Sequence, residues 1–222
     1  MLHTMWSVKG GSGVTLVTAR LARAFAERKG RAVIVDLRGD QPALLGLPEP
    51  ETPGVCDWLA SPDGSSAALS RLLVDVGDGL SLLPRGSATA WTDVQASRLA
   101  TAFYDLECDV VIDAGVLSGP HLVEDAVVDV GRRLAGSGRS LMVTRPCYLA
   151  LRRAMSAELS ADGVILVREP GRVLGSDDVA AVLRRPVLAT VEVDPAIARA
   201  VDAGTLMRST RRTLDRSLRG VA

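Results

Sequence analysis

Short apolar segments alternate with longer amphipathic segments along most of the 222 residues. The short segments are rich in Val, Ile and Leu and lie at residues 3–8, 32–36, 80–84, 109–113, 140–144, 163–167 and 186–191. Because they are apolar on both sides, we expect parallel strands covered by helices on both faces. The alternation predicts an α/β fold with a single doubly wound, mostly parallel sheet of seven to eight strands. Such sheets bind ligands at the carboxyl ends of their strands.

The amphipathic segments predict helices between these strands, at residues 14–29, 89–106, 120–135, 146–160 and 176–184. In the first of them, Leu21, Ala24 and Phe25 fall on one side, and Gly30 is a typical helix end. Residues 38–66 are rich in Pro and Gly, so we expect loops there and no long helix.

Charge, cysteines and histidines exclude several classes of protein. The 26 basic residues balance 26 acidic ones, which argues against a protein that mainly coats nucleic acid. Cys56, Cys108 and Cys147 lie far apart and predict buried thiols, with neither a zinc site nor a disulfide framework. His3 and His121 are too isolated for a metal cluster. Without a signal peptide or an apolar run of about 20 residues, the sequence predicts a soluble cytoplasmic protein.

A glycine-rich segment joins the first predicted strand to the first predicted helix. It reads Val-Lys-Gly-Gly-Ser-Gly-Val-Thr over residues 8–15. Glycines let backbone N–H groups close on a phosphate, and the helix N-terminus adds partial positive charge. Thr15 stands where a hydroxyl would ligate Mg²⁺. The segment therefore predicts a phosphate site, with an ordinary tight turn as the alternative.

The motif KGGSGVT resembles the deviant Walker A motif of the ParA/MinD family of P-loop ATPases, normally KGGxGK[ST]. RAVIVDLRGDQPALLGL resembles the second strand of that family and its acidic motif, and YDLECDVVIDAG resembles its Walker B strand. The resemblance covers nearly the whole chain. It implies a nucleotide site formed by Lys9, Gly10, Gly11, Ser12, Gly13, Val14 and Thr15. It implies Mg²⁺ ligands at Thr15, Asp36 and Asp113, and a homodimer in which Lys9 reaches the partner's phosphates.

Four departures from the family pattern predict that nucleotide chemistry is lost or weak. Val14 replaces the lysine that reaches the β and γ phosphates, and losing that contact costs about 1.5–3 kcal/mol of affinity. Arg38 falls on the second Asp of the acidic motif, unless a shift in register makes Asp36 the second Asp or brings in Asp40. Val167 replaces the Asn that contacts adenine, and Glu192 replaces a Pro beside the base. We expect no cofactor, or weak binding of ATP with Mg²⁺.

The end of the chain is basic and amphipathic. We expect residues 1–204 to form the P-loop domain and residues 205–222 to form a helix packed on it or extending from it. The basic residues of this helix are Arg208, Arg211, Arg212, Arg216 and Arg219. Packing on the sheet, contact with an anionic membrane and contact with DNA all fit this pattern. Peripheral association with membrane or nucleoid therefore stays open beside a cytoplasmic location.

The resemblance and the departures together imply a ParA/MinD-like pseudo-ATPase that acts as a positioning or scaffolding factor. Pilus, secretion, division or partition machinery would be its cargo, since degenerate relatives include the TadZ/CpaE-like proteins of pilus assembly. One alternative is an atypical active ATPase for chromosome or plasmid partitioning that uses Lys9, Asp36 and Asp113. Another is an inactive subunit that offers Lys9 to an intact ParA-type partner.

Overall fold

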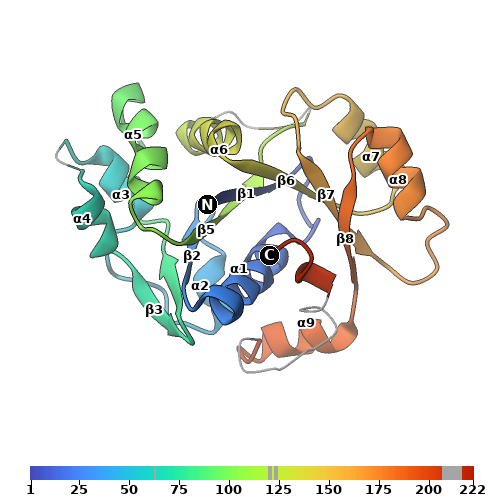
Figure 1. Ribbon diagram of the computed structural model, residues 1–222, viewed down its shortest axis with the longest axis horizontal. Coiled ribbons are helices and arrows are strands. Elements are labelled where there is room, and N and C mark those ends of the chain that lie inside the picture. The colour runs from blue at the N-terminus through green and yellow to red at the C-terminus, as the bar shows by residue number, and fades with distance from the viewer. Residues whose placement is uncertain (63, 120–121, 123–124, 207–216) are drawn as a thin grey trace.

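The computed structural model describes residues 1–62, 64–119, 122, 125–206 and 217–222 (Figure 1). Within these residues the strands are β1 (Leu2–Ser7), β2 (Ala32–Asp36), β3 (Val74–Gly77), β4 (Leu80–Leu83), β5 (Asp109–Val116), β6 (Arg139–Thr144), β7 (Gly163–Arg168) and β8 (Val187–Glu192). They form one eight-stranded sheet in the order β3-β4-β2-β5-β1-β6-β7-β8. Neighbours are parallel except for the antiparallel edge pair β3 and β4. The predicted α/β fold is confirmed.

Helices cover both faces of the sheet (Figure 1). They are α1 (Val14–Lys29), α2 (Gln41–Leu45), α3 (Val55–Ala60), α4 (Ser66–Ser70), α5 (Asp93–Tyr104), α6 (Ala126–Ser137), α7 (Tyr148–Met155), α8 (Ser176–Leu183) and α9 (Pro195–Asp202). Helices α1, α2 and α9 contribute to the buried core on one face, and α3 to α8 contribute to the core on the other. None of the described helices has both the length and the apolar character that a bilayer span needs.

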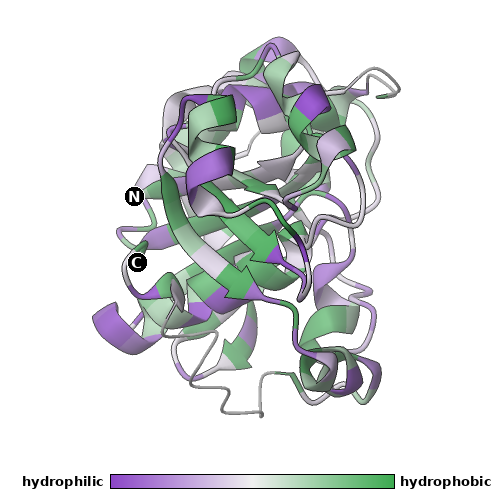
Figure 2. Ribbon diagram, turned by 90° about the vertical axis from the view of Figure 1, so that its right-hand side faces the viewer, coloured by the Kyte–Doolittle hydropathy of each residue, from purple (hydrophilic) through white to green (hydrophobic). Residues whose placement is uncertain are grey.

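Strand β1 shows why the predicted strands are apolar on both sides. Its side chains alternate between the faces, so that Trp6 packs in one core and Met5 in the other. Figure 2 shows the same pattern, with mostly hydrophobic strands at the centre of the molecule. The Trp6 indole Nε1 donates to Ser140 Oγ at 2.9 Å, which satisfies the polar atom of a buried ring.

Helix α1 has the predicted bounds because glycines define both of its ends. Gly13 before it and Gly30 after it have φ angles of 95° and 81°, in the left-handed region that favours glycine. Leu21 and Phe25 of this helix are buried against the sheet. The glycine at the start of α1 also places the glycine-rich loop directly at the N-terminus of the helix.

Several predicted helix bounds were wrong for local reasons. The helix predicted at 146–160 spans only Tyr148–Met155, because Ser156 and Ala157 donate backbone N–H groups to carbonyls three residues earlier and tighten its last turn. The helix predicted at 120–135 begins at Ala126, after Asp125 caps it through a 2.7 Å bond from Val128 N. Strand β3 was not predicted, whereas α9 lies in PVLATVEVDPAIARAVDAG, a segment that resembles a strand-helix unit of the ParA/MinD family.

A hydrogen-bond network around the buried Asp109 lies at the amino end of β5, at the end of the sheet opposite that of the glycine-rich loop. Asp109 accepts hydrogen bonds from Lys29 Nζ at 2.7 Å and from His3 Nε2 at 3.2 Å. Burial lowers the pKa of His3, although Asp109 opposes that shift. His3 is thus a buried residue of the core, and His121 lies outside the described residues.

The cysteine prediction is only partly correct. Cys56, Cys108 and Cys147 are free, but only Cys56 is buried, and the other two are half-buried. Burial raises the pKa of the Cys56 thiol to about 11. Cys56 is therefore protonated at neutral pH and packs as a small apolar side chain.

The end of the chain packs on the same core as α1. Leu206, Leu218 and Val221 are buried there, and Arg139 Nη1 donates to Val221 O at 3.0 Å. Arg219 is exposed. The rest of the predicted basic set lies outside the described residues, namely Arg208, Arg211, Arg212 and Arg216. The division of the chain at residue 204 stays a prediction.

Candidate functional site

The loop between β1 and α1 has the backbone shape of a phosphate cradle. Gly11 and Gly13 have φ angles of 73° and 95°, which side chains with a Cβ rarely adopt. Ser12 Oγ donates to Lys9 O at 2.8 Å and holds the loop closed on itself. The first N–H groups of α1 point toward this loop, as they do in anion-binding sites. The backbone therefore fits a phosphate group.

The two lysine positions of the motif differ in burial. Val14 is only 7% exposed and belongs to the same buried cluster as Met5 and Val143. Lys9 is half-buried, and its Nζ, on the exposed side of the loop, donates to Gly10 O at 3.1 Å. The position at which the motif has its phosphate-contacting lysine is thus a core position in this chain.

The two residues predicted beside a base are also unlike a nucleotide site. Val167 is buried in the same cluster as Val14, and its Cγ2 lies 3.6 Å from the place where a Cβ on Gly13 would stand. Glu192 forms an ion pair with Arg168 Nε at 2.9 Å. The apolar side chain of Val167 therefore approaches the glycine-rich loop from β7, and the Glu192 carboxylate on edge strand β8 pairs with an arginine of β7.

Asp36 and Asp113, which the resemblance places at a Mg²⁺ site, lie side by side on neighbouring strands. They are register partners in the β2–β5 pair, and both side chains are fully buried. Asp36 accepts backbone N–H bonds from Arg38 at 2.9 Å, Gly39 at 2.7 Å and Gln41 at 2.9 Å. Both of its oxygens are therefore used to shape the turn between β2 and α2.

Gln41 joins the two other positions that were predicted to hold Mg²⁺. Its fully buried side-chain amide donates through Nε2 to Asp113 Oδ2 at 2.9 Å and to Thr15 O at 3.0 Å. The Thr15 side chain also hydrogen-bonds Asp113. Sequence reasoning missed Gln41, although it directly follows Asp40 in the acidic motif.

The two aspartates resist ionisation together. Burial raises the pKa of Asp113 to about 6 and the negative charge of Asp36 adds to the shift, while hydrogen bonds from Gln41, Thr15 and Gly115 oppose it. Burial also raises the pKa of Asp36, against the backbone N–H groups of its turn. Neighbouring buried carboxylates of this kind favour a proton, a donor or a cation between them.

Arg38 takes the place of the second aspartate of the family motif and has a different role. Its guanidinium donates through Nε to Ala114 O at 3.0 Å and through Nη2 to Val116 O at 2.9 Å, across the end of β5. Asp40 precedes α2 and is exposed. The acidic site of the described residues therefore consists of Asp36 and Asp113, without Asp40.

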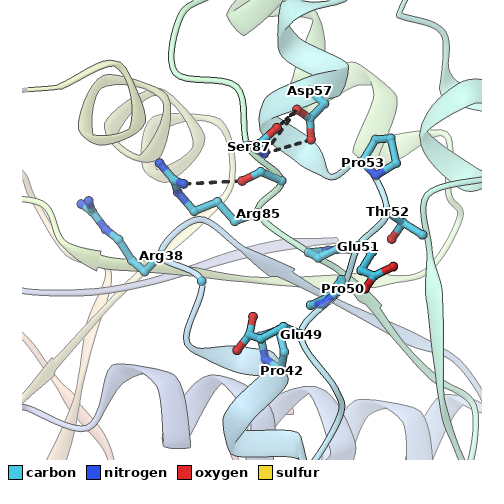
Figure 3. Close-up of a pocket in the computed structure, with 13 residues that line it drawn as sticks. Arg38, Pro42, Glu49, Pro50, Glu51, Thr52, Pro53, Asp57, Arg85 and Ser87 are labelled. Carbon is cyan, nitrogen blue, oxygen red and sulfur yellow. Dashed lines mark hydrogen bonds between the residues drawn. The ribbon is translucent and has the colours of Figure 1, made fainter.

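A cavity of about 500 Å³ lies beside Arg38, at the carboxyl ends of β2 and β4 (Figure 3). Arg38 and Arg85 line one side of it, and residues 49–53 line the other. Asp57 fixes part of the wall by accepting from Gly54 N at 2.7 Å and Ser87 Oγ at 3.0 Å. Sequence reasoning expected loops here and did not predict this cavity.

The site fits a phosphate group better than a nucleotide-bound Mg²⁺ ion. The glycine cradle and the helix N-terminus suit phosphate, but position 14 supplies no cation. Asp36 accepts three backbone N–H bonds from its own turn, and Asp113 accepts from the amide of Gln41. Over the described ranges, no group of three or more His, Cys, Asp or Glu side chains could hold a metal ion. The residues present do not fit the metal.

Comparisons with known proteins identify the fold. No family model and no curated protein matches the sequence. The ParA family ATPase from Chlorobium tepidum TLS is 18% identical with a TM-score of 0.78, over 100% of this chain and 97% of that one. The MinD cell division protein of Aquifex aeolicus is 16% identical with a TM-score of 0.78, over 99% and 94%.

The septum site-determining protein MinD of Pyrococcus horikoshii OT3, solved with Mg-ADP, is 20% identical with a TM-score of 0.70, over 99% of this chain and 93% of that one. All three structures match along nearly the whole length of both chains, as the sequence resemblance implied. Likeness at these identities establishes the fold. This chain therefore has the α/β fold of the ParA and MinD proteins.

Proposed function

We propose that this chain is a ParA/MinD-like protein that has lost ATPase activity and acts as a spatial positioning or scaffolding factor. The burial of Val14 carries the proposal. In P-loop ATPases a lysine cradles the β and γ phosphates and stabilises the charge that develops during transfer. Val14 can do neither, and its 7% exposure shows that the side chain serves the core instead.

The acidic residues support the same conclusion. Hydrolysis needs a carboxylate or amide that positions the attacking water, and Mg²⁺ held by the P-loop Thr and the Walker B Asp. Here Arg38 is bonded to β5, Asp36 is bonded to its own turn, and Asp113 is bonded to Gln41. The residues at the water and metal positions are thus engaged in contacts within the chain.

We also propose a homodimer that forms without nucleotide, through the face that carries the glycine-rich loop. Strands β1 and β6 are parallel neighbours. The start of α7, after β6, therefore lies at the same carboxyl end of the sheet as the glycine-rich loop, after β1. Tyr148 and Leu149 in the first turn of α7 are 73% and 47% exposed. Exposed apolar side chains near the loop suit a direct protein contact in place of a nucleotide bridge. The cargo we propose is a pilus, secretion, division or partition assembly.

Calorimetric titration of ATP with Mg²⁺ into the pure protein tests the loss of nucleotide binding. We expect no binding below millimolar concentrations, and a micromolar dissociation constant would contradict the proposal. The Pyrococcus horikoshii MinD, solved with Mg-ADP, is the positive control for the assay. Sedimentation without nucleotide tests the dimer, since the double variant Tyr148→Ser, Leu149→Ser should be monomeric and the unmodified chain dimeric. A monomeric unmodified chain would contradict the dimer alone.

The exposed amine of Lys9 favours a second candidate function. An inactive subunit could offer this lysine to the phosphates of an intact ParA-type partner, because Nζ lies on the exposed side of the loop. Lys9→Ala should then abolish stimulation of the partner's ATPase without abolishing co-purification. Unchanged stimulation would exclude this role.

A further inference from the structure

The side-chain amide of Gln41 lies between the backbone carbonyl of Thr15 and the carboxylate of Asp113, beside the Thr15 side chain that also bonds Asp113. P-loop ATPases hold Mg²⁺ with residues at these two positions. We propose that the Gln41 amide stands in for the divalent cation at Asp113 and excludes a metal ion from the site. The inference deepens the proposed function and rests on it, because it explains how two neighbouring buried aspartates are accommodated without nucleotide or Mg²⁺.

The contacts of Gln41 fix the orientation of its amide. Nε2 lies 2.9 Å from Asp113 Oδ2 and 3.0 Å from Thr15 O, and both partners are acceptors. The nitrogen end of the amide must therefore point between them. The backbone N–H of the same residue donates to Asp36 Oδ2 at 2.9 Å. One residue thus supplies donors to both aspartates and to the P-loop helix.

The other end of the amide shows that this arrangement is not simple core packing. Gln41 is completely buried, with a relative exposure of 0%. Its Oε1 has no hydrogen-bond partner within the described part of the chain. Burying an acceptor without a partner is costly, and an apolar side chain would avoid that cost. The donors facing Asp113 and Thr15 are what an apolar residue could not supply.

The position of Gln41 follows from the turn that precedes it. It is the first residue of α2, and Pro42 follows it where a helix needs no N–H donor. Asp36 holds the backbone of the turn through Arg38, Gly39 and Gln41. The amide is therefore delivered to Asp113 by a rigid turn, and truncating the side chain should open a cation position without moving the aspartates.

Binding of Mn²⁺ in the absence of nucleotide tests this inference, with free Mn²⁺ measured by electron paramagnetic resonance. We expect the unmodified protein to bind Mn²⁺ no more tightly than millimolar. Gln41→Ala and Gln41→Ser should bind it about tenfold more tightly or better, the scale on which neighbours of a metal ligand change affinity. The double variant Gln41→Ala, Asp113→Asn should lose that gain.

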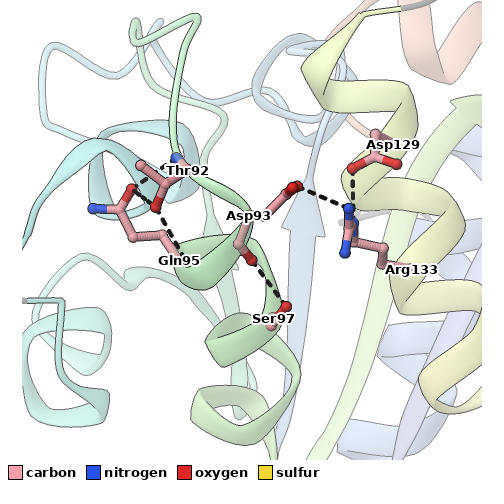
Figure 4. Close-up of polar contacts among 6 residues, drawn as sticks. All are labelled: Thr92, Asp93, Gln95, Ser97, Asp129 and Arg133. Carbon is pink, nitrogen blue, oxygen red and sulfur yellow. Dashed lines mark hydrogen bonds and ion pairs between the residues drawn. The ribbon is translucent and has the colours of Figure 1, made fainter.

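The chain's other glutamine provides a matched control. Gln95 caps α5 by accepting from Thr92 N at 2.9 Å (Figure 4). Its amide donates to Ser61 O, away from Asp36 and Asp113. Gln95→Ala should bind Mn²⁺ like the unmodified protein. Circular dichroism of each variant establishes that it is folded, and Gln41→Ser retains a small polar group if the alanine variant fails to fold.

Two results would overturn the inference. One is Mn²⁺ binding by the unmodified protein at micromolar concentrations that Asp113→Asn abolishes, a result that needs no Gln41 variant. The other is a folded Gln41 variant with no gain in affinity. Because nucleotide is omitted, either result leaves the prediction of weak ATP binding intact. Conversely, micromolar ATP binding with no Mn²⁺ site in the unmodified protein would overturn the proposed function alone.

Discussion

Replacing Val14 tests whether the second lysine position of the motif has become part of the core. Val14→Ala removes two methyl groups from a side chain that is 7% exposed. Each buried carbon contributes about 0.8 kcal/mol, and the cavity left behind adds to the loss, so we expect destabilisation of about 2 kcal/mol. Val14→Lys loses the same contacts and also brings an amine toward an apolar cluster, so we expect about 3 kcal/mol or more.

The assay is chemical denaturation followed by tryptophan fluorescence, since Trp6 and Trp58 are buried and report on the core. Val94 gives a matched control, because it lies in the first turn of α5 and is 69% exposed. Val94→Ala and Val94→Lys should change the free energy of unfolding by about 0.5 kcal/mol or less. A Val14→Lys protein with unchanged stability would refute the reasoning, because a buried core position cannot accept an amine without cost.

The remaining predictions concern stability. Gly54→Ala should cost about 3 kcal/mol in denaturation, because its Cβ would lie 2.2 Å from Pro84 O, whereas Gly10→Ala has nothing within 4 Å and should stay near the unmodified value. Asp109→Asn should cost about 2 kcal/mol at pH 7, since Lys29 and His3 lose a charged acceptor. Burial acts to raise the pKa of Asp109, but hydrogen bonds from Lys29 and His3 hold it below its usual value, so its contribution should disappear as the pH falls through that lowered pKa. The pKa of Asp113 is raised to about 6, so the folded state binds more protons, and Asp113 should add on the order of 2 kcal/mol of stability as the pH falls from about 7 to about 4. Asp113→Asn should remove that contribution in urea titrations across this range, and an unchanged pH dependence would contradict it.

The sequence predicted those parts of the fold that local residues determine. Residues 14–29 form α1 with the predicted bounds, because Gly13 and Gly30 end it by conformation. The central parallel strands β1, β2, β5, β6 and β7 were recognisable because each buries side chains on both faces. Strand β3 escaped prediction because it is an antiparallel edge strand whose residues alternate between half-buried and exposed. The tight last turn of α7 also carried no signal in the spacing of its apolar residues.

The candidate site was predictable only as far as the motif reaches. The loop at residues 9–15, Asp36 and Asp113 meet where the strand order requires, at the carboxyl ends of neighbouring strands. Gln41 was not predictable, because its partners are Thr15 and Asp113, 26 and 72 residues away in the sequence. The sequence showed that Val14 stands in place of the motif lysine. Its burial in the same cluster as Met5 could be seen only from the packing of α1 on the sheet.

The amide resonances of the glycine-rich loop give the most direct test of the central claim that this cradle no longer binds nucleotide. ¹⁵N–¹H correlation spectra of the unmodified protein would follow Gly10, Gly11 and Gly13 while ATP and Mg²⁺ are added. With Val14 in the core and Asp113 bonded to Gln41, we predict no saturable shift of these resonances below millimolar ATP. Saturable shifts of all three at micromolar ATP would contradict the account.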